Sequence, residues 1–469
     1  MKNIFFFLLF LSQSIIVFGQ MIEKPFVYGE TGGFVSNGEN APFWLYSNQF
    51  GVFNNNKNCL YARVLMGTEE NREKKFEVNY GMDLYGIRDK SNNLQFNQLY
   101  ATFRAFCIIF KGGLYRQVYG NQTSELSSGS VLFSSNARPY PKVSLGIDKY
   151  TFVPFTKGYV EIKGEVTHGW AENENRWVRD SYIHYKYVNI RFGGKKPLHF
   201  NYGYHHALQW GGVSSTLGRQ PSSLKDFVYL FFAKNPPGAN VVQSESFNQV
   251  GNHMGSRQYG LDYDFKNKTV GLYYQTIFED KSGSKFISPQ GDGLYGLTFK
   301  NNDETAHLKE VVLEFTKTTY QSGPIELVWV TDVPIPFWNP KAGNDNYFNN
   351  YIYQSWTYKG NTIGTPFITS PAINEKDSNI VTNNRVLAFY FAGLYEYNHL
   401  QCELKYSYSI NKGTYSVPIG EKGQHSMMFK VGRDIPSLKD LHVQLCVGWD
   451  KGAFLGNSFA LGVCAKKKF

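Results

Sequence analysis

The feature that most constrains the fold is a strict alternation of residue types that continues to the end of the chain. Between positions 441 and 469 the apolar set is Leu441, Val443, Leu445, Val447, Trp449, Phe459, Leu461, Val463 and Ala465, and small or polar residues fill the positions between them. Successive side chains of a strand point to opposite faces, so this pattern predicts a hairpin around Lys451-Gly452 with one apolar face. The chain then ends on Phe469, in phase with that face. A transmembrane β-barrel closing on its first strand has this signature, although a soluble sandwich shows the same alternation in one hairpin.

The same alternation recurs from about residue 60 to the end of the chain. Stretches 76–84, 160–166, 259–265 and 401–410 each carry apolar or aromatic residues on one face and polar or charged residues on the other. A soluble sheet rarely has so consistently charged an inner face, and no linker divides the chain. We therefore predict an all-β fold, one transmembrane antiparallel barrel, and the length fits roughly 16 to 18 strands at about ten residues per strand.

The N-terminus predicts export. Lys2 precedes an apolar stretch at 4–11, and a second apolar patch ends at the small Gly19. This pattern indicates a secretory signal peptide, residues 1–20, followed by a barrel domain, residues 21–469. Ser12-Gln13-Ser14 interrupts the run, which argues against a membrane anchor, and no later stretch is apolar enough for a membrane helix. The mean hydropathy of −0.37 suits a barrel whose strands face water on one side. We expect the protein to lie in the outer membrane of a Gram-negative bacterium.

Charge and cysteine usage limit the partners. The formal net charge of +10 favours an anionic partner, such as an acidic polysaccharide or the phosphates of lipopolysaccharide, but solvation of the lumen explains it equally well. An exported chain has no nucleic-acid partner. The five cysteines include no CxxC pair, and Cys446 and Cys464 are expected to be small strand residues rather than a disulfide.

No catalytic signature is present. The sequence contains no GxSxG, HExxH, P-loop or dinucleotide-binding motif, and its acidic residues sit singly on alternating faces. We predict a non-enzymatic protein with no catalytic residues, no metal and no cofactor. An outer-membrane hydrolase is the weakest alternative.

Two long stretches do not alternate, residues 118–157 and 331–384. Long structureless segments in a compact fold are usually functional loops, so we expect them outside the cell or folded into the lumen as a plug. Residues 222–233 could form a short helix inside a loop.

The first candidate site is the cluster 201–212. His205 and His206 are adjacent, so on a regular strand they point to opposite faces and cannot easily share a metal. A hydrogen-bonding role at the lumen or rim is favoured for His205. Gln209 and Trp210, followed by two glycines, fit a sugar-stacking platform, or Trp210 anchors the membrane interface.

The second candidate site is the aromatic and Asn-rich loop within 331–384. Aromatic faces stack on the apolar side of pyranose rings, and neighbouring amides satisfy hydroxyls. The candidates for polysaccharide contact are Trp338, Asn339, Tyr347, Asn349, Asn350, Trp356 and Tyr358. The alternative is that these rings pack the loop onto itself and plug the barrel.

The whole mature chain resembles the Wzi family of capsule-assembly outer-membrane proteins, in the form found in Bacteroides-like bacteria. The matching stretches are Ala41 to Gly51 (APFWLYSNQFG), His205 to Gly212 (HHALQWGG), Asn252 to Tyr263 (NHMGSRQYGLDY) and Gly343 to Phe367. Their order over most of the chain carries the resemblance, since no single motif is a fingerprint. The resemblance implies a barrel of about eighteen strands and a lectin-like role in holding capsular or other exported polysaccharide at the cell surface. No family motif places the sugar contacts, and the helical segment of the best-known members has no strong counterpart here.

The expected function is therefore attachment or assembly of surface polysaccharide by a monomeric barrel embedded in outer-membrane lipid and lipopolysaccharide. The main alternative is a porin-type channel for small solutes. What separates the two is whether residues 331–384 fill the lumen.

Overall fold

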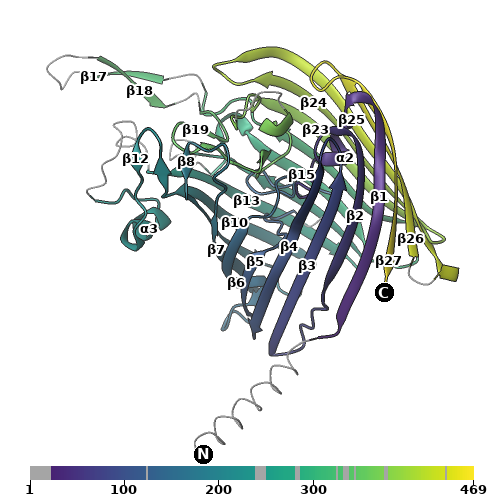
Figure 1. The fold of residues 1–469 in the computed structure, drawn as a ribbon. Coiled ribbons are helices and arrows are strands. Elements are labelled where there is room, and N and C mark those ends of the chain that lie inside the picture. Colours follow the sequence, from purple (N-terminus) through teal and green to yellow (C-terminus); the bar gives the residue numbers. More distant parts are fainter. Residues whose placement is uncertain are drawn as a thin grey trace, which may run out of the picture.

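The computed structural model is a closed antiparallel barrel of 18 strands (Figure 1). It describes residues 23–122, 125–237, 250–279, 286–323, 326–330, 337–342, 345–373, 379–438 and 441–469, with the backbone alone at 289, 326–330 and 337–342. The predicted signal peptide, residues 1–20, lies outside the described residues and stays a prediction.

Each barrel strand pairs with the next barrel strand along the chain. In order around the barrel these strands are β1 (Pro25–Asn40), β2 (Asn56–Thr68), β3 (Phe76–Arg88), β4 (Asn92–Ala105), β5 (Ile108–Leu114), β6 (Pro141–Phe152), β7 (Val160–Trp170), β9 (Tyr182–Phe192), β10 (Leu198–Trp210), β13 (Asn252–Phe265), β14 (Lys268–Gln275), β15 (Gly293–Asn301), β16 (Leu308–Lys317), β23 (Val386–Tyr397), β24 (Leu400–Gly413), β25 (Pro418–Ile435), β26 (Leu441–Gly452) and β27 (Ser458–Lys468). The predicted all-β barrel of about eighteen strands is confirmed.

The connections contain the remaining elements. These are the helices α2 (Phe43–Tyr46) and α3 (Leu224–Phe231), the short strands β8 (Val178–Arg179), β11 (Val213–Ser214), β12 (Gly218–Arg219), β17 (Glu326–Val330), β18 (Phe337–Ala342), β19 (Asn349–Asn350), β20 (Gln354–Ser355), β21 (Thr357–Tyr358) and β22 (Asn361–Thr362), and the 3-10 turns at Pro289–Gly291, Pro371–Ile373 and Pro436–Leu438. The short helix expected within 222–233 is α3, whose start is fixed by a capping box between Ser223 and Asp226. Among the described residues, no helix has the length and apolar character needed to cross a membrane.

The last strand closes the barrel on the first, as the C-terminal alternation predicts. β27 runs antiparallel to β1 with Gly32 opposite Cys464. A side chain at position 32 would not fit this seam, because its Cβ would lie 2.6 Å from the Cβ of Cys464 and 2.7 Å from the carbonyl oxygen of Val463. Backbone can approach this closely only at glycine. Cys446 and Cys464, like the other cysteines, are free thiols.

The apolar faces of the strands point away from the lumen. Leu445 and Leu461 are 61% and 58% exposed. The polar residues that alternate with the apolar ones along each strand, such as Asp83, Glu314 and Ser407, are buried inside the barrel. An apolar exterior and a polar interior are what a lipid-embedded barrel needs.

The two ends of the barrel differ. The start of β1 and the end of β27 lie at one end, which we call the terminal end, where the connections are short, such as 106–107, 266–267 and 398–399. The connections at the opposite end are long, notably 41–55, 115–140, 211–251 and 318–385. Outer-membrane barrels have short periplasmic turns and longer extracellular loops, so the long connections mark the outer end.

One predicted boundary is wrong. Residues 118–157 were expected to be a single non-alternating loop, but 141–152 form the barrel strand β6. The pairing of β6 with β7 shifts register between Ile147 and Thr151. A bulge of this kind interrupts the period of two, which is why the sequence pattern hides the strand.

Candidate functional site

The long connections 41–55 and 115–140 reach into the barrel and bind its inward-facing side chains. The indole Nε1 of Trp44 donates to Ser407 Oγ at 3.1 Å, and the backbone N of Phe43 donates to Asp450 at 3.0 Å. Ser127 Oγ and the backbone N of Ser128 donate to Glu314 at 2.5 and 2.8 Å. The interior of the outer end is therefore built from loop residues as well as from wall residues.

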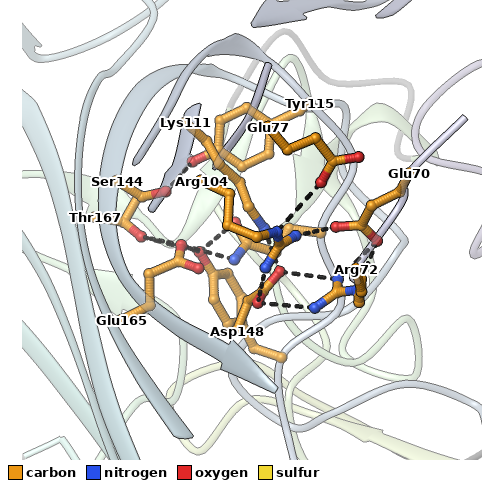
Figure 2. Close-up of polar contacts among 12 residues, drawn as sticks. Glu70, Arg72, Glu77, Arg104, Lys111, Tyr115, Ser144, Asp148, Glu165 and Thr167 are labelled. Atoms are coloured by element: carbon orange, nitrogen blue, oxygen red, sulfur yellow. Dashed lines mark hydrogen bonds and ion pairs between the residues drawn. The ribbon is translucent and has the colours of Figure 1, made fainter. Parts of the chain in front are cut away.

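Near the terminal end, a network of ion pairs joins the lumen wall to the connection 69–75 (Figure 2). Arg104 contacts Glu70, and it lies 3.3 Å from both Glu77 and Asp148. Arg72 also contacts Asp148, at 3.2 Å. Lys111 is the third cation, 3.6 Å from Asp148. The basic groups are matched by carboxylates, so this wall presents no excess of one charge sign.

At the outer end, the connection 171–181 is fastened to the loop 345–373. The Nη1 and Nη2 atoms of Arg176 donate to the backbone oxygens of Ser355, at 3.3 Å, and Thr357. Its Nε lies 3.2 Å from Glu172, which also accepts from the backbone N of Lys359 at 2.5 Å. We call this contact the Arg176 joint.

The Arg176 joint is shielded from water. Burial raises the pKa of Glu172 above its usual value and lowers the pKa of Arg176. A buried ion pair is costly to break, because removing either partner leaves an unpaired charge inside the protein. The segments on either side of it are therefore held in fixed register.

Two aromatic rings lie beside the joint and remain accessible. Trp177 is 43% exposed and Tyr351 is 50% exposed. Their chain neighbours Val178, Ile352 and Tyr353 form a small buried cluster, which brings the two segments together. We call Trp177 and Tyr351, with the adjacent Asn350, the rim platform. Exposed rings beside amide groups suit stacking on sugar rings with hydrogen bonds to hydroxyls.

The predicted loop residues divide between the interior and the rim. Tyr347, Trp356 and Tyr358 are buried, and Trp356 Nε1 donates to the carbonyl oxygen of Leu132 at 2.8 Å. Asn349 and Asn350 are half-buried: Asn349 binds the backbone of Val381, and Asn350 Oδ1 accepts from the backbone N of Ile352 and Tyr353 at 2.9 Å each. Trp338 and Asn339 lie in β18, and their side chains are outside the described part of the chain.

The residues predicted on β10 are not brought together. His205 points inward, is fully buried and lies 2.7 Å from Tyr185 Oη and 3.0 Å from Asn189 Oδ1. Gln209 also points inward and donates to the carbonyl oxygen of Ser355 at 3.2 Å, which links the barrel wall to the loop. Trp210 packs against α3 instead. In the described ranges no group of three or more His, Cys, Asp or Glu side chains is placed to hold a metal ion.

Sequence reasoning missed Trp177. It lies in the segment NENRWVRD, a short polar connection between the alternating stretches 160–170 and 182–192. Strand packing does not explain a single large aromatic ring in a polar connection. This isolated tryptophan was the sequence signal that could have identified Trp177 as a candidate binding residue.

Replacing Arg176 by glutamine should lower the free energy of local opening at the Arg176 joint by about 2 kcal/mol, which is the usual cost of losing hydrogen bonds made by a charged group. Backbone amides of residues 353–363 should then exchange with deuterium on the order of tenfold faster or more. Arg179→Gln, an exposed arginine of the same connection, is the matched control and should exchange like wild type. Equal exchange in Arg176→Gln and the control would show that the joint does not hold the loop.

A closed 18-strand barrel with an apolar exterior, short turns at one end and long packed connections at the other defines an outer-membrane β-barrel protein. The family model for capsule assembly protein Wzi matches residues 43–456, and this chain belongs to that family.

The solved structure of one member of this family shows the same fold. Wzi of Escherichia coli, reported as an outer-membrane protein involved in group 1 capsule assembly and a carbohydrate-binding β-barrel, is 13% identical with a TM-score of 0.57, over 97% of this chain and 86% of that chain. OpdO of Pseudomonas aeruginosa is 12% identical with a TM-score of 0.48, over 96% of this chain and 99% of that chain. Among curated proteins no sequence matches the chain.

Proposed function

We propose that this protein holds capsular or other exported polysaccharide at the outer surface of a Gram-negative cell by lectin-like, non-catalytic binding. Membership of the Wzi family supports a role in capsule assembly, and Escherichia coli Wzi is reported to bind carbohydrate. The observation that carries the proposal for this chain is the rim platform, where Trp177 and Tyr351 are exposed beside a buried joint at the outer end.

The candidate residues have two roles in this proposal, contact with the sugar and support of the loop. Trp177, Tyr351 and Asn350 contact the sugar, and Trp338 and Asn339 remain proposed contacts. Tyr347, Trp356 and Tyr358 support the loop from beneath, because their rings are enclosed by protein. Gln209 and His205 hold the wall in place below the loop. The protein functions as a monomer surrounded by outer-membrane lipid and lipopolysaccharide.

The experiment that tests attachment compares a deletion strain with its parent. Polysaccharide bound to cells and polysaccharide released into the medium are both measured. More released polysaccharide at an unchanged total supports attachment. An unchanged distribution, together with a growth or uptake defect on particular solutes, would favour the channel instead.

The barrel should not behave as an open pore, because the connections 41–55 and 115–140 are hydrogen-bonded to inward-facing residues of β14, β16, β24 and β26. In planar lipid bilayers, the purified protein is expected to give no conductance steps of open-porin size. An engineered variant lacking residues 125–137, which lie within the second connection, is the positive control and should conduct. Regular large steps from the wild-type protein would support the porin alternative.

A further inference from the structure

Helix α3 lies on the outside of the barrel wall, at its flank (Figure 1). The ring of Phe227 contacts the rings of His168 on β7, His184 on β9 and Trp210 on β10, at centroid distances of 5.5, 5.1 and 5.1 Å. His184 belongs to the outward face of β9, because its neighbour Tyr185 packs inside the barrel. The first part of this connection, residues 211–231, therefore turns back down the exterior of the barrel instead of extending outward from it.

The helix has three distinct faces. At 100° per residue, Phe227, Leu230 and Phe231 lie on the side that packs against the wall. Leu224 and Val228 lie on the next side and are 79% and 51% exposed. The third side is polar and carries Lys225, Asp226 and Tyr229.

The side carrying Leu224 and Val228 continues past the end of the helix to Phe232, which is 66% exposed. A helix that is apolar on one side and polar on the other, and lies flat against a surface, is typical of a membrane interface. Here the helix packs against outward-facing side chains of β7, β9 and β10.

The position of α3 along the wall places it at the height of the lipid. Phe192 lies near the turn at the terminal end of the barrel, and His184 lies about eight residues further along β9. Eight residues span ~26 Å along a strand, which is roughly 20 Å of height when the strand is tilted by about 40°. The apolar band of an outer-membrane barrel is about 25 Å tall. His184 is nevertheless fully buried, and the Nζ of Lys186 lies 3.5 Å from the ring centroid of Phe231. The helix thus covers polar side chains that would otherwise face acyl chains, where they are costly.

We propose that α3 is an interfacial helix whose exposed apolar side, Leu224, Val228 and Phe232, inserts among the acyl chains of the outer leaflet. The occupant is lipid because α3 packs against the outward face of β7, β9 and β10 at the height of the lipid, and leaves these three apolar side chains exposed there. The helix gives the protein a lipid contact formed by an extracellular connection, in addition to the contact made by the strands. This inference does not depend on polysaccharide binding.

The test uses an environment-sensitive fluorophore attached to one introduced cysteine, in a background in which all five native cysteines, which are free thiols, are replaced by alanine. Val228→Cys and Leu224→Cys place the label on the exposed apolar side, and Lys225→Cys is the matched control one helical step away. All three positions are exposed, so the substitutions leave the packing of α3 intact. Folding is checked by the heat-modifiable mobility of the barrel on gels.

In vesicles of lipids brominated on the acyl chain, the labels at 224 and 228 should be quenched at least twofold more than the label at 225. Aqueous iodide should give the reverse order. Labels at 224 and 228 that respond to iodide and not to brominated lipid would overturn the proposal. Protection of these labels from both quenchers would also overturn it, because a second protein chain would then cover the helix.

Discussion

Replacing Trp356 by alanine is expected to cost about 3–5 kcal/mol of local stability, which is the usual range for removing a large buried ring from a core. Trp356 is fully buried, and its indole donates to the carbonyl oxygen of Leu132, so the change leaves both a cavity and an unpaired acceptor. Trp356 takes no part in the hydrogen-bonded pairing of the barrel strands, although its ring lies in a buried cluster with wall residues such as Tyr185 and Tyr273. We expect faster hydrogen exchange and proteolysis in residues 345–373 with unchanged barrel assembly, and weaker polysaccharide retention as a consequence.

The control for this variant is Trp177→Ala, which removes an exposed ring from the same part of the molecule. It should leave exchange in 345–373 close to that of wild type. If Trp356→Ala also exchanges like wild type, the loop is stabilised by other contacts and the assignment of Trp356 as a support is wrong.

The double substitution Trp177→Ala with Tyr351→Ala should lower the affinity for the native polysaccharide at least tenfold, or about 1.4 kcal/mol. About half of each side chain is exposed, and aromatic stacking contributes about 0.5–1.5 kcal/mol per ring beyond the buried area. Because both rings are accessible, their loss should change the stability of the barrel little. Isothermal calorimetry with polysaccharide isolated from the same strain measures the effect.

Trp170→Ala is the matched control for the rim platform. Trp170 is 47% exposed, similar to Trp177, but it ends β7 on the outward face of the barrel. Its loss should leave polysaccharide affinity unchanged. Equal affinity in the double variant and wild type would place the sugar site elsewhere, with Trp338 and Asn339 as the next candidates.

Alternation made the barrel predictable. Each strand has one face in lipid and one in the lumen, so a period of two appears directly in stretches such as 76–84 and 401–410, and the closing pair β1–β27 follows from the apolar phase of the last strand. β6 escaped detection because the bulge between Ile147 and Thr151 breaks the period.

The candidate site was harder to predict than the fold, for a physical reason. Trp177 and Trp356 both lie in connections that lack any regular period, so the sequence gives no indication of which way either ring faces. Which way each ring faces depends on contacts between segments far apart in the sequence, such as the bond from Trp356 to Leu132 and those from Arg176 to Ser355 and Thr357. Local patterns contain no information about such contacts, whereas tertiary packing decides them.

The fastening of the outer loop at several points has a mechanical consequence. A long polymer attached at the rim exerts drag whenever fluid moves past the cell. Tension on Trp177 or Tyr351 passes through Arg176 to β7 and β9, and through the hydrogen bond from Gln209 to Ser355 into β10. The load is thereby shared among neighbouring strands that each have a complete set of hydrogen-bonded partners, so a tethered chain would pull on the whole cylinder rather than unravel one loop.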